Sequence, residues 1–93
     1  MNVVVSCRPH FWEWFPKGDW IVEIKDGSTF SDLVNELATK LPLQFMEVME
    51  EIKRENSHFV ALVNGRSIAS LNQFDTRIEP NSQITFTLML NGG

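Results

Sequence analysis

The residues best placed to do chemistry in this chain of 93 residues are the last two, Gly92 and Gly93. Two successive glycines at a given place arise by chance in about 0.5% of sequences, since glycine makes up ~7% of residues. Because neither residue has a side chain, the chain end can enter a tunnel too narrow for a Cβ atom and present only its carboxylate. We therefore expect a reactive carboxylate on Gly93, carried by a flexible tail at about residues 90–93, with Gly92 and Asn91 as the residues a partner holds.

The other nucleophilic and metal-binding side chains form no recognisable site. Cys7 is the only cysteine, and in an apolar run we expect it to be a small buried residue; a role in passing sulfur would need exposure and a lowered pKa. His10 and His58 have no Ser, Cys or acidic partner at a catalytic spacing and are expected on the surface or in loops. One Cys and two distant His cannot form a closed zinc site, so no metal is predicted.

Two runs near the N-terminus predict paired strands. Residues 2–7 are mostly β-branched, and in residues 19–25 Trp20, Val22 and Ile24 alternate with more polar positions. The intervening segment carries two prolines and four aromatic residues, which we expect either to dock on a partner or to fold over one end of the core. These aromatic residues are Phe11, Trp12, Trp14 and Phe15.

Two amphipathic helices are predicted between the strands. Thr29 and Asp32 form a capping pattern before an apolar face that Pro42 ends. The spacing from Leu43 to about Glu55 predicts a second helix, in which Glu50 and Arg54 can pair. Its other glutamates are expected on a solvated face. The apolar face of the first helix comprises Phe30, Leu33, Val34, Leu37 and Leu41, and that of the second Phe45, Val48, Met49 and Ile52.

Further strands are predicted in the C-terminal half. The apolar run 59–63 is expected to be covered on both faces, and Asn64-Gly65 favours a hairpin turn after it. Residues 83–90 alternate, so that Leu90 lies with Leu88 on the core side of a last strand. Met89 is then the better candidate for contact with a partner, although Leu90 is also a candidate for that role.

The order of these elements predicts an α+β fold with helices on one face of a mixed sheet. If the first and last strands are parallel neighbours in its centre, residues 29–55 are long enough to cross over between them. A chain of this length supports one domain, residues 1–93.

Composition narrows the classes of function. No apolar run approaches the ~20 residues that span a bilayer, and no signal-peptide pattern begins the chain, which predicts a cytoplasmic protein without a membrane partner. A net charge of −4 opposes binding to a phosphate backbone, so no nucleic acid is expected. An acidic surface suits a protein partner with a basic face.

Several C-terminal features occur together: Val63-Asn64-Gly65 after an apolar strand, a loop at residues 75–80, the alternating last strand and Gly92-Gly93. With these features, residues 63–93 resemble the C-terminal half of the ubiquitin-like sulfur carriers. That family includes the small subunit of molybdopterin synthase, the thiamin-pathway sulfur carrier and the ubiquitin-related modifier. The N-terminal half matches only as a pattern of strands and helix. The resemblance implies a β-grasp fold, a mixed sheet with one or two helices packed on one face.

The resemblance also implies a chemistry. A ubiquitin-activating-like adenylyltransferase joins the Gly93 carboxylate to AMP from ATP, a sulfur nucleophile displaces AMP, and the resulting thiocarboxylate gives its sulfur to a precursor in a synthase subunit. The chain itself is then a cosubstrate or small subunit and not an enzyme, it binds no cofactor, and the catalytic groups lie in its partners.

The resemblance leaves the pathway open. A predicted second helix fits the molybdopterin-type and modifier-type chains better than the shorter thiamin carriers, and the molybdopterin-type small subunit, with its large subunit as partner, is favoured. Many such subunits carry proline just before the glycines, whereas this chain has Thr87 to Asn91, an ending closer to the modifier. The alternatives are a modifier joined through Gly93 to lysines or donating sulfur to tRNA, a thiamin carrier, and a protein-interaction domain whose terminal glycines do nothing.

Overall fold

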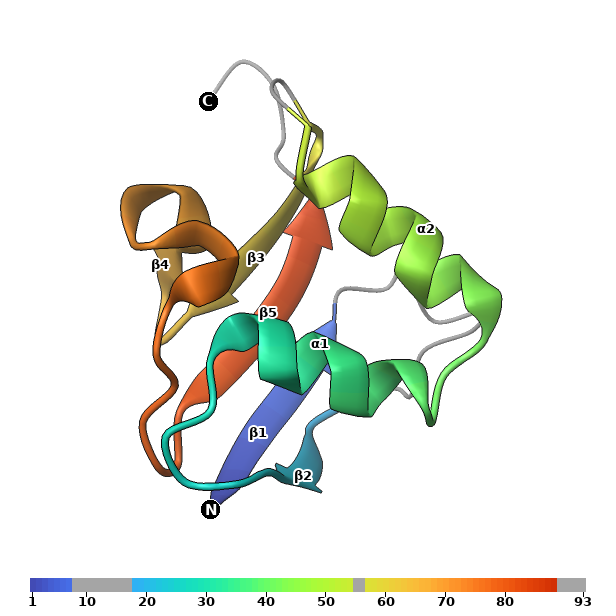
Figure 1. Cartoon of the computed structure of the whole chain (residues 1–93). Helices are drawn as coiled ribbons and strands as arrows, with labels where there is room; N and C mark the ends of the chain where they lie inside the picture. Colours follow the sequence, from blue (N-terminus) through green and yellow to red (C-terminus); the bar gives the residue numbers. More distant parts are fainter. Residues whose placement is uncertain (8–17, 55–56, 89–93) are drawn as a thin grey trace.

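The computed structural model describes residues 1–7, 18–54 and 57–88, in which five strands form one mixed sheet. The strands are β1 (Asn2–Cys7), β2 (Trp20–Glu23), β3 (Phe59–Val63), β4 (Arg66–Ser67) and β5 (Gln83–Leu88). Their order is β2-β1-β5-β3-β4 (Figure 1). The first and last strands pair in parallel and the other neighbours are antiparallel, so the arrangement considered from the sequence, with a crossover through residues 29–55, is the one observed.

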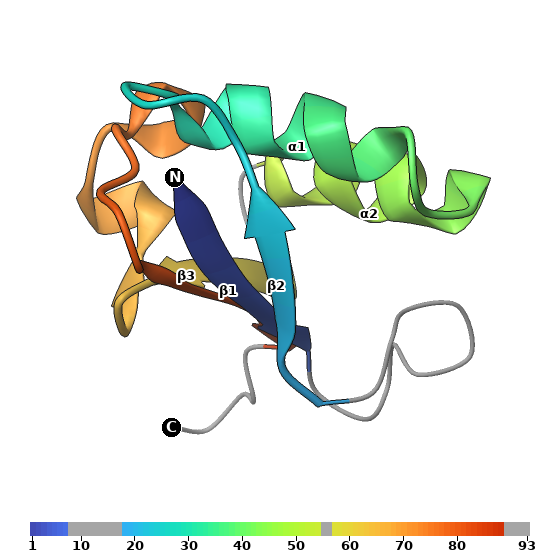
Figure 2. The ribbon, with the colours of Figure 1, turned by 90° about the horizontal axis from the view of Figure 1, so that it is seen from below.

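Two helices form a second layer on one face of this sheet (Figure 2). They are α1 (Phe30–Ala38) and α2 (Leu43–Ile52), and two 3₁₀ turns follow β4, η2 (Ile68–Ser70) and η3 (Gln73–Asp75). Thr29 caps α1 as predicted: its hydroxyl accepts from the Asp32 N–H at 3.3 Å, and the Asp32 carboxylate accepts from the Thr29 N–H at 2.9 Å. This reciprocal pair satisfies two N–H groups that have no partner within the helix. The α+β prediction is confirmed.

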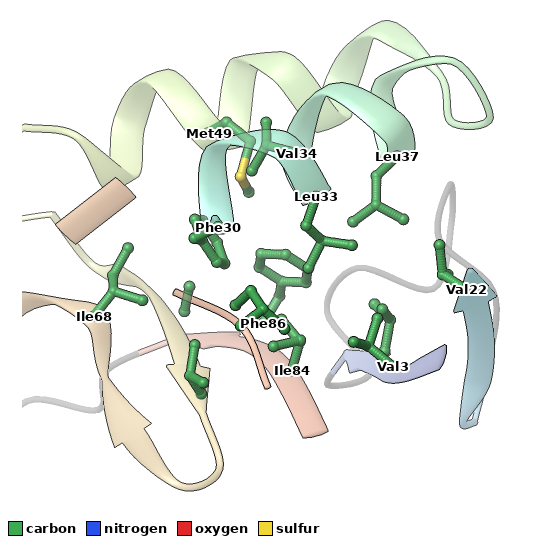
Figure 3. Close-up of a cluster of buried hydrophobic side chains, with 14 of the residues drawn as sticks. Val3, Val22, Phe30, Leu33, Val34, Leu37, Met49, Ile68, Ile84 and Phe86 are labelled. Carbon is green, nitrogen blue, oxygen red and sulfur yellow. The ribbon is translucent and has the colours of Figure 1, made fainter. Parts of the chain in front are cut away.

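The core lies between the two layers. Leu33 and Leu37 of α1 point toward the sheet, where Val3 of β1 and Ile84 of β5 face them (Figure 3). Phe86 of β5 lies at the centre, and its ring is 5.9 Å from that of Phe45 and 6.2 Å from that of Phe30. The alternation along β5 therefore divides as the sequence predicts, with the even-numbered positions facing the helices.

The hairpin turn after β3 is also confirmed, and it fixes the start of β5. Asn64 and Gly65 have φ angles of 51° and 84°, as the mirror-image turn that suits twisted strands requires. The Asn64 side chain then accepts from the Gln83 N–H at 2.8 Å and donates to the Ser82 hydroxyl at 3.3 Å. One asparagine thus closes the turn between β3 and β4 and holds the start of β5 in register with β3.

Two local predictions are wrong. Arg54 pairs with Glu51 at 3.0 Å, not with Glu50, which pairs with Lys53 at 3.3 Å. Because α2 ends at Ile52, Arg54 lies beyond its last turn, and the residue three positions earlier is the closer one. The run 59–63 is not covered on both faces either, since the two described helices lie on one side of the sheet and leave Val60 half-buried on the other.

Candidate functional site

The predicted functional residues lie outside the part of the chain that the structure describes. This holds for the tail and for both predicted aromatic contacts. The residues concerned are Phe11, Trp12, Met89, Leu90, Asn91, Gly92 and Gly93. What the structure defines is the base from which the tail departs, which is the end of β5 at Leu88.

The base of the tail lies between two paired strands. Leu88 pairs with Phe59 at the start of β3, and Phe86 pairs with Ala61 of β3 on one side and with Cys7 of β1 on the other. Because β5 is hydrogen-bonded along both edges and its Phe86 side chain is 2% exposed, the strand is held in place up to the residue before the tail.

The other end of β5 is fixed by the loop that precedes it. The Asn81 N–H donates to the Asn2 carbonyl at 2.8 Å, and the Val4 N–H donates to the Ser82 carbonyl at 2.9 Å. Earlier in the same loop, the Ile78 N–H donates to the Ser28 carbonyl at 2.9 Å. These bonds tie the loop to β1 and to the segment before α1, so that both layers of the fold determine where β5 starts and points.

The parallel register places the ends of β1 and β5, after which two predicted contact segments begin, at the same end of the sheet. Cys7, the last described residue before the aromatic segment, pairs with Phe86, two residues before the end of β5. Since parallel strands end at the same side of a sheet, residues 8–17 and 89–93 both begin there. The two segments are separated by residues 18–88 in the sequence, and the register of the parallel pair shows that they begin at the same end of the sheet.

Within ranges 1–7, 18–54 and 57–88, no helix or strand covers the sheet face opposite α1 and α2. Ile21 of β2 is 67% exposed on that face and lies across from Val4. Val60 and Leu62 of β3 are half-buried on the same face, where Thr85 of β5 separates them from β1. A partner that takes the tail would meet a mostly apolar and hydroxyl-bearing surface there, and sequence alternation alone would have found these positions.

Cys7 is buried, as predicted, and its thiol is a weak nucleophile at neutral pH. Its side chain is 7% exposed, and burial raises the pKa of the thiol to about 11. At pH 8 a thiol with that pKa is thiolate in about one molecule in a thousand, and the thiolate is the nucleophile. The geometry therefore disfavours a sulfur-relay role for Cys7, although the residue lies close to the base of the tail.

We expect iodoacetamide to alkylate Cys7 of the folded chain at least about 100-fold more slowly at pH 8 than in the unfolded chain, where a thiol pKa is about 8.5. Mass spectrometry of timed reactions with and without guanidinium chloride measures the ratio. Because the folded pKa is the higher one, the stabilising contribution of the neutral thiol is complete below about pH 8.5 and is lost as the pH rises through about 11. Equal alkylation rates in the two states would show that Cys7 is accessible.

A metal site requires a group of ligating side chains, and a membrane span requires a long apolar helix. No group of three or more His, Cys, Asp or Glu side chains in ranges 1–7, 18–54 and 57–88 could hold a metal ion. In the same ranges, no helix is long and apolar enough to cross a membrane. The solvated face predicted for Glu47, Glu50, Glu51 and Glu55 is confirmed for Glu47 and Glu50, which are exposed; Glu51 is half-buried, and Glu55 lies outside the described residues.

A mixed five-stranded sheet with a central parallel pair, an open face and two crossover helices on the other face is the ubiquitin-like β-grasp fold. The chain is similar in structure to SAMP1 from Haloferax volcanii, over 100% of both chains, with a TM-score of 0.74 and 15% identity. It is similar to the putative molybdopterin converting factor subunit 1 from Pyrococcus furiosus over 96% of this chain and 98% of that one, with a TM-score of 0.70 and 17% identity. Urm1 from Trypanosoma brucei is matched over 99% and 95% of the two chains, with a TM-score of 0.70 and 14% identity.

These structures are members of the ubiquitin-like sulfur-carrier group that residues 63–93 resemble, so the likeness expected from the sequence is confirmed in the fold. No protein-family model and no curated protein sequence matches the chain. At 14–17% identity the likeness establishes the β-grasp fold of this chain.

Proposed function

We propose that the chain is a sulfur carrier that receives sulfur at the carboxylate of Gly93 and delivers it in molybdopterin synthesis. The observation that carries this proposal is the position of the Gly92-Gly93 segment, which follows the central strand β5 of a β-grasp sheet after three intervening residues. A rigid strand with a side-chain-free end is suited to present a carboxylate inside another protein. The structural likeness to a putative molybdopterin converting factor subunit supports the choice of pathway.

The chemistry begins with a poor acyl donor. A carboxylate oxygen of Gly93 attacks the α-phosphorus of ATP, pyrophosphate leaves, and the product is a mixed anhydride with AMP. A sulfur nucleophile then attacks the acyl carbon, and AMP departs with the electron pair of the broken C–O bond. Where the nucleophile is hydrosulfide, loss of its remaining proton to solvent leaves a thiocarboxylate on Gly93. Where it is a persulfide, a thiol reductant supplies the two electrons that break the S–S bond to the donor and leave the same thiocarboxylate. ATP binds to the adenylyltransferase, which supplies the catalytic groups, and this chain acts as cosubstrate in the cytoplasm.

The partner surface in this proposal consists of the segments that leave one edge of the sheet. Asn91 and Gly92 lie in the partner's tunnel, while Met89 and Leu90 contact its mouth. Phe11 and Trp12 belong to the same surface, because their segment starts at Cys7, which pairs with β5. The two partners are a ubiquitin-activating-like adenylyltransferase and the sulfur-accepting large subunit of the synthase.

A second candidate function is protein modification, in which the Gly93 acyl group is transferred to a lysine amine. It is favoured by the likeness to the small archaeal modifier protein 1 from Methanosarcina acetivorans, with 20% identity and a TM-score of 0.71 over 99% of this chain and 96% of that one. Adenylation is common to both functions, and they differ only in the nucleophile that receives the acyl group.

The intact mass of the protein tests both functions. After incubation with ATP, a sulfur source and the adenylyltransferase of its host, we expect a mass gain equal to the replacement of one oxygen atom by one sulfur atom. A chain without Gly93 should show no gain. Conjugates through lysine in place of this gain would favour the modifier function. If neither product forms and no adenylate is detected, the chain is an interaction domain and the proposal is wrong.

A further inference from the structure

The edge strand β4 is shorter than β3 and pairs with only part of it. The edge strand β4 has two residues and pairs only with Leu62 and Val63 of β3 in the part of the chain that is described. At Ser67 the chain turns into η2, and the Ser67 hydroxyl accepts from the Ala69 N–H at 3.2 Å. No described strand therefore lies beside Val60 and Ala61 on this side, while β5 pairs with both on the other.

A groove lies along this edge, and we call it the α2–β3 groove. Its volume is about 360 Å³, and it is lined by Val60 and Ala61 of β3 and by Ile52 at the end of α2. The η2 turn forms the opposite wall with Ile68 and Ala69. Figure 1 shows β3 running between the end of α2 and these turns. The groove thus has a mostly apolar lining and lies beside the edge of the sheet.

The charged side chains that line the groove are cationic, and each pairs with a glutamate of α2, Arg54 with Glu51 at 3.0 Å. Lys53 and Arg54 are its only charged lining residues among those described, in a chain with a net charge of −4. The Lys53 ammonium lies 3.3 Å from Glu50 and 5.2 Å from the centre of the Phe74 ring. Exposed ion pairs of this kind contribute little to stability, so both cations remain available to a carboxylate from outside.

We propose that the α2–β3 groove binds an extended acidic peptide segment of a protein partner, which adds to the sheet beside Val60 and Ala61. Because side chains alternate along a strand, apolar residues of the peptide enter the groove while its carboxylates reach Lys53 and Arg54. Addition of a strand to an open sheet edge is a common mode of peptide recognition. This binding uses neither the tail nor ATP, and it is independent of the proposed sulfur chemistry.

The test uses a capped peptide of about eight alternating valine and glutamate residues, which spans about 27 Å when extended, titrated into the full chain. We expect saturable changes in the amide NMR shifts of Val60, Ala61 and Ala69, and none at Ile21 on the opposite edge strand. The Lys53→Glu variant should weaken binding about tenfold. Ala69→Trp, a change at an exposed position, should obstruct the groove without altering charge. A peptide with lysine in place of glutamate should not bind.

Lys40→Glu is the matched control for Lys53→Glu. Lys40 on the α1 side pairs with Glu36 at 2.9 Å and is 45% exposed, against 51% for Lys53, but it does not line the groove. We expect the Lys40 variant to bind within about twofold of the parent chain. Equal weakening by the two variants would show that net charge alone attracts the peptide. That result, shift changes confined to β2, or a titration without saturation would overturn the proposal.

Discussion

A chain extended by one residue after Gly93 is expected to fold like the parent chain and to gain no sulfur. The proposed tunnel admits a tail without Cβ atoms, and the added residue moves the carboxylate of Gly93 into a peptide bond, where no adenylate can form on it. Intact mass after incubation with ATP, sulfur source and adenylyltransferase measures the loss, which should be complete. Pyrophosphate release by the adenylyltransferase should fall with it, since the block precedes the sulfur step.

An extension by lysine provides its own control. Carboxypeptidase B removes a terminal lysine, so the same preparation regains the Gly93 carboxylate, and sulfur transfer should return to the level of the parent chain. A thermal unfolding curve before and after removal verifies that the fold is unaffected, as expected for a change six residues beyond the end of β5. Sulfur transfer to the extended chain would contradict a function at the Gly93 carboxylate.

Removal of the Phe86 ring is expected to cost the largest part of the folding free energy of any single change on β5. The ring is 2% exposed and meets Phe30 of α1 and Phe45 of α2, so Phe86→Ala opens a cavity between sheet and both helices. Such changes lower the free energy of unfolding by about 3–5 kcal/mol, against a total of about 5–15 kcal/mol for a domain. Urea unfolding followed by circular dichroism measures the difference.

Leu43→Ala is the control for this core variant. Leu43 is the first residue of α2 and is 81% exposed, so the same loss of apolar side chain should change the free energy of unfolding by no more than about 0.5 kcal/mol. A loss below about 1 kcal/mol in Phe86→Ala would mean that the two helices do not pack on β5 as described. The amount of sulfur transferred to the Phe86→Ala chain should fall only in proportion to the fraction of that chain that is unfolded.

The sequence determined the parts of the fold that depend on local patterns. Alternation in residues 83–88 identifies the core face of β5, the Thr29 and Asp32 pair predicts the start of α1, and Asn64-Gly65 predicts the turn after β3. In each case the interaction is made within a few residues, or the pattern repeats at the period of the element. The site at Gly92 and Gly93 stays a prediction of the same local kind, since two adjacent residues without side chains can be recognised without knowledge of the fold.

Tertiary structure decided which distant segments share a surface. The pairing of Cys7 with Phe86 places the ends of β1 and β5, after which residues 8–17 and 89–93 begin, at the same end of the sheet, and nothing local to either strand sets that register. The short β4 leaves the edge of β3 beside Val60 and Ala61 without a strand, and packing of α2 brings Lys53 to it. These features arise from contacts between residues far apart in the chain, whose energy depends on the packed core as a whole and not on any sequence period.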